Sequence, residues 1–249
     1  MPALGVVVFS FQGMKHLSEC LKSVRWADEV LVLHAGGGEP ETGGGTFPAL
    51  KILRVDSLSE AGRHCSAIRT DWVLHLWGQE RVEAELGEEL QALRRGVRSG
   101  GPSAYRIPIR SYLLGCWAEG SVSGPIAAVR LGRSMEKIPL GWWRKGETFP
   151  MLGRGWIGDY ACSQLSDAVG HVQGLSDFWA ESLLGTASPP SPPRAVLCAL
   201  GVFARTVVGN RLFAHGIAGV TLSALASYAV LLSGAKLWEG RHVGVRRRR

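Results

Sequence analysis

Three short apolar runs near the start of the chain constrain its fold more than any other feature of the sequence. They occupy residues 4–9, 30–33 and 72–76. Runs this short and this apolar are typical of central strands in a parallel sheet, where helices cover both faces. A fourth short strand is expected at residues 51–55. The chain therefore begins as an α/β fold, which predicts a Rossmann-like, mostly parallel sheet with helices on both faces.

Helical patterns separate these strands. Leucines recur at helical spacing within residues 17–24 and 83–95, and a capping-box spacing at Ser57 and Glu60 predicts a further helix that ends near Arg69. We expect the strands at residues 30–34 and 72–77 to be adjacent and parallel, because strand-helix-strand units connect parallel strands. In such folds the ligand lies beyond the carboxyl ends of the strands. This places it near His34 and Trp77.

The sequence as a whole predicts a first domain, a linker and a C-terminal helical segment. Residues from about 104 to 185 are less regular, begin with an expected strand at residues 105–109, and complete a first domain over residues 1–185. The prolines of residues 188–193 then predict a stiff linker over residues 186–194. Residues 195–249 are expected to form apolar helices followed by a basic tail.

The C-terminal segment points to a membrane. Residues 217–235 carry no charge, and 19 residues at ~1.5 Å each are long enough to cross a bilayer. A membrane span, a buried helical hairpin and a pair of helices lying in the headgroup region all remain open. The cations at the margins of the segment favour the interfacial arrangement. They are Arg194, Arg205, Arg211 and Lys236.

The charge distribution favours lipid over nucleic acid. The chain has a net charge of +7, and Arg241 with residues 246–249 supplies five of those charges. A short arginine cluster beside an apolar segment is typical of contact with an anionic membrane surface, whereas a basic stripe interleaved with aromatic residues is missing from the sequence. The five cysteines are scattered without a C-x-x-C pair, and the N-terminus lacks the pattern of a signal peptide. Reduced thiols on the cytoplasmic side of a membrane fit best.

Several blocks of residues occur in the order found in one enzyme family. The chain resembles the family-2 glycosyltransferases, in particular the β-glucosyltransferases that build the lipopolysaccharide core of bacteria. The resemblance extends over nearly the whole chain. It is carried by residues 20–30, 71–74, 80–82, 105–108, Arg110, Tyr112, Leu114, Gly115, Trp117, and residues 211–219 and 235–239.

The resemblance implies a glycosyltransferase-A type fold at the cytoplasmic face of the bacterial inner membrane. A nucleotide sugar would lie across the strand ends, and a divalent cation, Mg²⁺ or Mn²⁺, would neutralise the leaving diphosphate. The acceptor would be a lipid-linked glycan or a lipopolysaccharide core.

The family motifs fall on unusual residues in this chain. The Asn-Glu pair after the first strand falls on residues 11–13, which makes Ser10 and Gln12 the candidate nucleotide contacts there. The aspartate that closes the second strand falls on His34. The metal-binding Asp-x-Asp falls on residues 77–79, where Gly78 and Gln79 stand.

Two carboxylates remain near these motifs. Glu80 is a candidate metal ligand beside the former Asp-x-Asp, although an acid that begins a helix or faces solvent gives the same pattern. Glu136 aligns with the acid of the family's His-Glu motif, which would accept the proton of the acceptor hydroxyl. Neither tryptophan nor glycine ligates a hard cation, so ordinary metal-assisted transfer is not expected.

Two functions of different classes follow from these observations. The first is a catalytically degenerate glycosyltransferase-like protein that serves at the membrane as a scaffold or regulatory partner of an active glycosyltransferase. The second is an active inverting glycosyltransferase that moves a sugar from a nucleotide-sugar donor to a lipid-linked or lipopolysaccharide acceptor. Only the second requires Mg²⁺ or Mn²⁺. The altered motifs favour the first.

Overall fold

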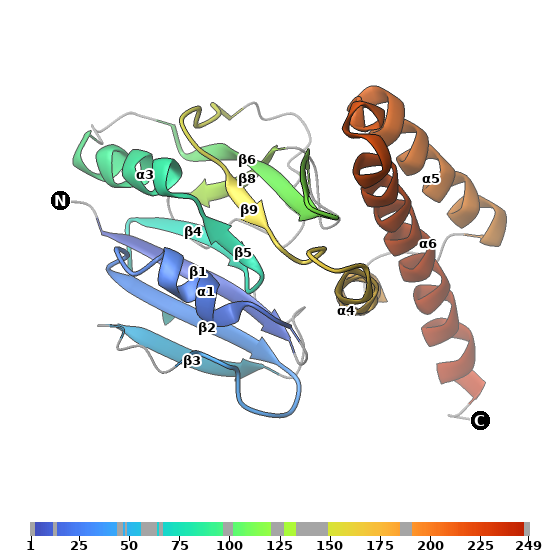
Figure 1. Ribbon diagram of the computed structural model, residues 1–249. Coiled ribbons are helices and arrows are strands. Elements are labelled where there is room, and N and C mark those ends of the chain that lie inside the picture. The colour runs from blue at the N-terminus through green and yellow to red at the C-terminus, as the bar shows by residue number, and fades with distance from the viewer. Residues whose placement is uncertain are drawn as a thin grey trace. The chain divides into compact units, whose positions relative to one another are not determined.

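The computed structural model describes most of the chain, and Figure 1 shows its helices and strands. The described residues are 3–11, 14–43, 47, 49–55, 64, 67–96, 102–120, 127–132, 149–184 and 191–246. They form two compact units by their contacts. The first comprises Met1–Arg110 and Pro125–Tyr160, and the second comprises Ser111–Gly124 and Ala161–Arg249.

Four parallel strands form the first half of the sheet. They are β1 (Leu4–Phe11), β2 (Glu29–Ala35), β3 (Leu50–Val55) and β4 (Trp72–Trp77), in the order β3-β2-β1-β4. The four strands expected from the sequence are confirmed. The expected adjacency of β2 and β4 is wrong, because β1 lies between them and pairs with both. β1 is buried along almost its whole length, which is why it takes the central place.

The second half of the sheet corrects the prediction of a mostly parallel sheet. The order continues β8-β6-β9-β5, and β7 pairs with β6. β8 is antiparallel to β4 and β6, and β5 is antiparallel to β9. β6 buries alternate residues, as antiparallel strands with one wet face do. These strands are β5 (Glu80–Val82), β6 (Ala104–Leu113), β7 (Cys116–Glu119), β8 (Ala127–Gly132) and β9 (Ile157–Asp159).

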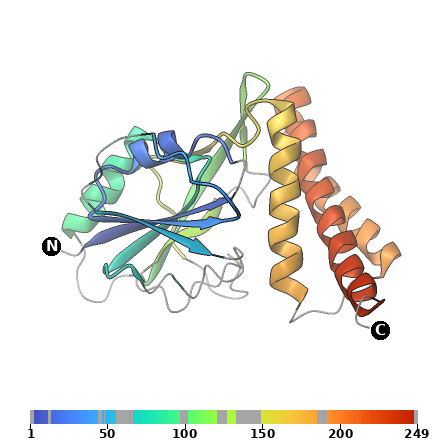
Figure 2. The same cartoon turned by 90° about the horizontal axis from the view of Figure 1, so that it is seen from below.

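The helices α1 (Leu17–Ser23) and α3 (Ala84–Gly96) cover the same face of the sheet, as Figures 1 and 2 show. Leu17 and Leu21 of α1 and Leu86 and Leu90 of α3 belong to one buried cluster with side chains of β1, β2 and β4. Both helices were expected from their leucine spacing. The helix expected over residues 57–69 lies largely outside the described residues, so the prediction of helices on both faces is not tested there.

The second unit contains three long helices, α4 (Leu165–Leu184), α5 (Pro192–Ala204) and α6 (Gly216–Arg246). α6 packs against both α4 and α5. The Lys236 ammonium forms an ion pair of 2.6 Å with Asp177 on α4 and donates to the Ser176 hydroxyl at 2.8 Å. Lys236 therefore holds two helices together, and its expected place at a membrane margin stays a prediction.

The expected linker over residues 186–194 ends earlier than the prolines indicated. Pro192 and Pro193 occupy the first turn of α5, where a missing N–H costs nothing because the first amides of a helix have no partner within it. The expected end of the first domain at residue 185 also differs from the observed partition, since α4 belongs to the helical unit. Its apolar residues Val172 and Leu175 are buried.

One helical segment among the described residues, Leu212–His242, is long and apolar enough to cross a membrane. The mean hydropathy of its most apolar stretch of 18 residues is 1.7, and 39% of that stretch is buried inside the protein. The apolar C-terminal helices expected from the sequence are thus confirmed as helices. Length and composition alone do not distinguish a span from a packed helix.

We expect Gly155→Ala to destabilise the first unit. A Cβ at residue 155 would lie 2.7 Å from the Leu86 Cα and closer still to the Leu86 amide nitrogen at the start of α3. Because these Leu86 atoms belong to the backbone, they cannot easily move aside. The free energy of unfolding should therefore fall by about 1–3 kcal/mol. Urea unfolding followed by circular dichroism measures it. Gly153→Ala is the matched control, because nothing lies within 4 Å of its Cβ position. Equal stability of the two variants would contradict the packing described here.

Candidate functional site

The candidate site lies at the carboxyl ends of β1, β2 and β4. The chain leaves β1 toward β2 on one side, whereas β4 lies on the other side, so the strand order reverses between β1 and β4. Ligands of open α/β sheets bind in the crevice outside such a switch point. Ser10 and His34 are register partners near the ends of β1 and β2, and Phe9 is the partner of Trp77 on β4.

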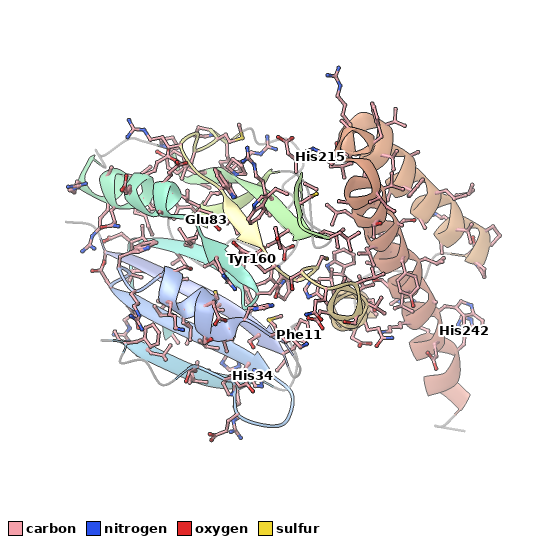
Figure 3. All side chains as sticks on the ribbon, viewed as in Figure 1. Phe11, His34, Glu83, Tyr160, His215 and His242 are labelled. Atoms are coloured by element: carbon pink, nitrogen blue, oxygen red, sulfur yellow. The ribbon has the colours of Figure 1, made fainter. Side chains whose placement is uncertain are left out.

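Ser10 and His34, two of the predicted nucleotide contacts, are brought together. Both are buried, and the Ser10 hydroxyl shares a hydrogen bond of 3.2 Å with the His34 Nδ1. Burial lowers the pKa of His34, and the neighbouring Arg54 lowers it further, so the imidazole is neutral near pH 7. Figure 3 shows Phe11 and His34 at the same edge of the sheet. The side chain at this position is therefore a neutral imidazole and not a carboxylate.

The residues at the expected metal position form a tight turn between β4 and β5. The Gly78 N–H donates to the Phe9 carbonyl at 2.8 Å. The Glu80 carboxylate accepts a hydrogen bond of 2.8 Å from the Trp77 backbone N–H and is completely buried. Gln79 is buried as well. The Glu80 side chain therefore points into the protein, toward the backbone of its own turn.

The space beside this turn is filled by protein. A Cβ at residue 78 would lie 2.7 Å from the Met14 sulfur and 3.3 Å from a Leu17 methyl group, so only glycine fits without a shift. The Cys20 thiol of α1 contacts the Trp77 carbonyl at 3.6 Å. Burial raises the pKa of Cys20, and the charge of Glu80 raises it further, so this thiol stays protonated.

Asp159 was missed by the sequence analysis. It is fully buried on β9, directly opposite Glu80 of β5. Opposed residues of antiparallel strands place their side chains on the same face. Beside this pair the Arg81 guanidinium lies 4.0 Å from the centre of the Tyr160 ring, and the Tyr160 hydroxyl donates to Glu83 at 3.3 Å. Figure 3 shows Glu83 and Tyr160 in this region.

The residues present do not fit a divalent cation. Hard cations such as Mg²⁺ and Mn²⁺ take several oxygen ligands, usually including carboxylates. At the carboxyl ends of β1, β2 and β4, Trp77 and Gly78 offer no side-chain ligand and Gln79 offers only a neutral amide. Glu80 is bonded to its own turn, and Asp159 is the acid opposite it on β9. Across the described residues, no three His, Cys, Asp or Glu side chains gather closely enough to hold a metal ion.

Two predicted site residues lie outside the described part of the chain. They are Gln12, a candidate nucleotide contact, and Glu136, the candidate catalytic base. Their roles stay predictions. The structure thus brings together Ser10 and His34 on β1 and β2, and places Gly78, Gln79 and Glu80 in the turn after β4.

Comparison with known proteins gives only structural matches. No family model and no curated protein sequence matches this chain. Among solved structures, TarS of S. aureus has a TM-score of 0.45 and 11% identity over 95% of this chain and 55% of that chain. The chain thus spans about half the length of TarS. A crystal structure titled S. aureus TarS 1-349 has a TM-score of 0.43 and 11% identity, and the match covers 97% of this chain and 92% of that chain. HddC of Yersinia pseudotuberculosis has a TM-score of 0.42 and 8% identity, and the match covers 72% of this chain and 100% of that chain.

Glu80→Ala should destabilise the protein by about 2 kcal/mol or more, because the buried Trp77 N–H loses its acceptor. Glu80→Gln keeps an acceptor oxygen and should cost less. Urea unfolding of both variants measures the difference. Glu88→Ala, which removes an exposed acid from α3, is the control and should change stability by less than about 0.5 kcal/mol. Unchanged stability in Glu80→Ala would show that the carboxylate is not held inside the turn.

The buried His34 should make the protein sensitive to acid. Because its pKa is lowered from the ordinary value of 6.5, the unfolded chain binds more protons below that pH. The neutral His34 therefore contributes to the free energy of unfolding above pH 6.5. This contribution is lost as the pH falls toward the lower pKa that His34 has in the folded protein. We expect wild type to lose more stability than His34→Gln between pH 7.5 and pH 5. Equal losses, measured by urea unfolding, would contradict a buried neutral imidazole.

Proposed function

We propose that this protein is a catalytically silent, glycosyltransferase-like protein of envelope polysaccharide or lipopolysaccharide biosynthesis. It acts at the membrane as a scaffold or regulatory partner of an active glycosyltransferase. The observation that carries the proposal is the turn after β4, where the Glu80 carboxylate beside the expected metal position is buried and bonded to the Trp77 backbone.

The relation to glycosyltransferases is supported by the chain's own residues. The blocks that resemble the family occur in the family's order, and the helix α1 and strands β1, β2 and β4 form where the resemblance implies them. The resulting sheet presents its switch point where a nucleotide sugar would lie.

Charge is the reason for proposing silence. A nucleotide diphosphate brings at least two negative charges into the crevice, and an active enzyme opposes them with a bound cation. Here the corresponding positions hold an indole, a glycine, a buried amide and a neutral imidazole. Without a cation, backbone amides and the neighbouring Arg54 compensate a diphosphate poorly. The switch point therefore lacks the acids that would hold a cation against the diphosphate.

We expect titration calorimetry of the purified protein with UDP and UDP-glucose to show millimolar or weaker affinity, with or without Mn²⁺. Without a cation, leaving-group stabilisation is lost, and each ~1.4 kcal/mol lost lowers the rate about tenfold. Turnover of UDP-glucose should accordingly lie orders of magnitude below that of an active glycosyltransferase titrated as a positive control.

Micromolar affinity that depends on Mn²⁺ would overturn the proposal and favour the alternative, an active inverting glycosyltransferase. In that case the Glu80→Gln variant shows whether Glu80 or other residues of the chain bind the Mn²⁺. Loss of the Mn²⁺ dependence would identify Glu80 as a ligand, and its retention would locate the ligands elsewhere in the chain.

A further inference from the structure

The segment from α5 to the start of α6 exposes an unusual number of large apolar side chains. It includes η3 (Arg205–Gly209) and η4 (Leu212–His215), which connect the two helices. The exposed fractions reach 68% for Leu197, 67% for Val208 and 77% for Ile217. A contiguous patch of exposed apolar side chains usually marks a site where a protein contacts a partner or a membrane. We call the following residues the α5 face: Val196, Leu197, Leu200, Val208, Phe213 and Ile217.

The contacts of α5 show which of its sides is free. Ala195 and Ala199 are buried, and the Ala199 carbonyl accepts a hydrogen bond of 2.8 Å from the Ser227 hydroxyl of α6. This side of α5 therefore packs on α6. Leu197 and Leu200 are more than half exposed, which puts them on the outer side of the helix.

The charged side chains carried by α5, η3 and η4 themselves are all cationic, and Glu119 is an exposed acid on β7, a strand that packs against η4. Residues 182–238 contain no aspartate and no glutamate. Arg194 and Arg205 are exposed and lie eleven residues apart, which is about three helical turns, so they share one margin of α5. Arg211 is exposed between η3 and η4. An apolar helical face bordered mainly by arginines is complementary to an anionic lipid surface.

We propose that the α5 face lies in the headgroup region of an anionic bilayer, while α6 stays in the protein as the central helix of its unit. The inference deepens the membrane attachment contained in the proposed function and rests on it. The attachment is monotopic: apolar side chains of α5 and of its connection to α6 enter the acyl boundary, and Arg194, Arg205 and Arg211 contact lipid phosphates.

The packing of α6 argues against its insertion as a span. α4 packs against α6, and Lys236 joins the two through Asp177, Ser176 and the Gln173 carbonyl. α4 also carries Asp167. A bilayer around α6 would either strip α4 away or draw these charges into hydrocarbon, and charged groups there are costly. The α5 face can meet lipid without disturbing these contacts.

Vesicle co-sedimentation of the full-length protein tests the proposal. The vesicles are phosphatidylcholine with and without phosphatidylglycerol, at low and high salt. Wild type should bind the anionic vesicles at low salt. The double variant Leu197→Glu/Leu200→Glu should bind at least about tenfold more weakly. Arg194→Gln/Arg205→Gln should lose roughly tenfold of its affinity for anionic vesicles and part of its salt dependence, because Arg211 and the C-terminal arginines remain.

Two exposed apolar positions outside the α5 face provide matched controls. Val169→Glu on α4 and Leu231→Glu on α6 place the same charge on side chains of 39% and 37% exposure. Both variants should bind vesicles as wild type does. Circular dichroism and urea unfolding establish that all variants are folded. Point variants are preferable to deletion of the C-terminal segment, since deletion would expose the side of α4 that packs on α6.

The outcomes separate this inference from the proposed function. If wild type binds no vesicles, the membrane attachment in the proposed function fails together with this inference. If wild type binds but the α5-face variant binds equally well, or Leu231→Glu alone abolishes binding, only this inference fails. Self-association of wild type in size-exclusion chromatography that is lost in Leu197→Glu/Leu200→Glu would also overturn it, because the face would then cover a second copy of the chain.

Discussion

The burial of β1 on both faces is the constraint on which the rest of the first unit depends. Its side chains from Leu4 to Ser10 have almost no contact with water, and it pairs in parallel with β2 on one side and β4 on the other. The helices α1 and α3 cover one of these faces. Because a one-residue slip would turn every side chain to the opposite face, the register is fixed. The fixed register brings Ser10, His34 and Trp77 to one edge.

At that edge the same packing decides the chemistry. The turn from β4 into β5 is closed by the Glu80 carboxylate, and Met14, Leu17 and Cys20 fill the space around Gly78 and Trp77. A carboxylate used in this way stabilises the protein through a charge-assisted hydrogen bond. Because the Glu80 side chain is completely buried, a metal would have to open this packing to reach it.

Sequence patterns predicted the elements whose signals are local. β1, α1 and α3 follow from apolar periodicity within one segment, and their boundaries were close to those observed. The second half of the sheet was not predicted. β5 pairs with β9, which lies about 75 residues further along the chain, and no local sequence pattern identifies so distant a partner. Asp159 was missed for the same reason. The inward direction of Glu80 likewise depends on the turn that it closes, and its spacing in the sequence is equally typical of a surface acid.

We propose that the Glu80 carboxylate, beside the expected metal position, belongs to the fold and not to a ligand site. A crystal structure of the protein grown with Mn²⁺ and UDP, with anomalous diffraction recorded at the manganese edge, tests it most directly. We expect no anomalous peak within coordination distance of Glu80, and a Glu80 carboxylate still bonded to the Trp77 N–H. A manganese peak at Glu80 with UDP phosphates beside it would show instead that Glu80 is a metal ligand.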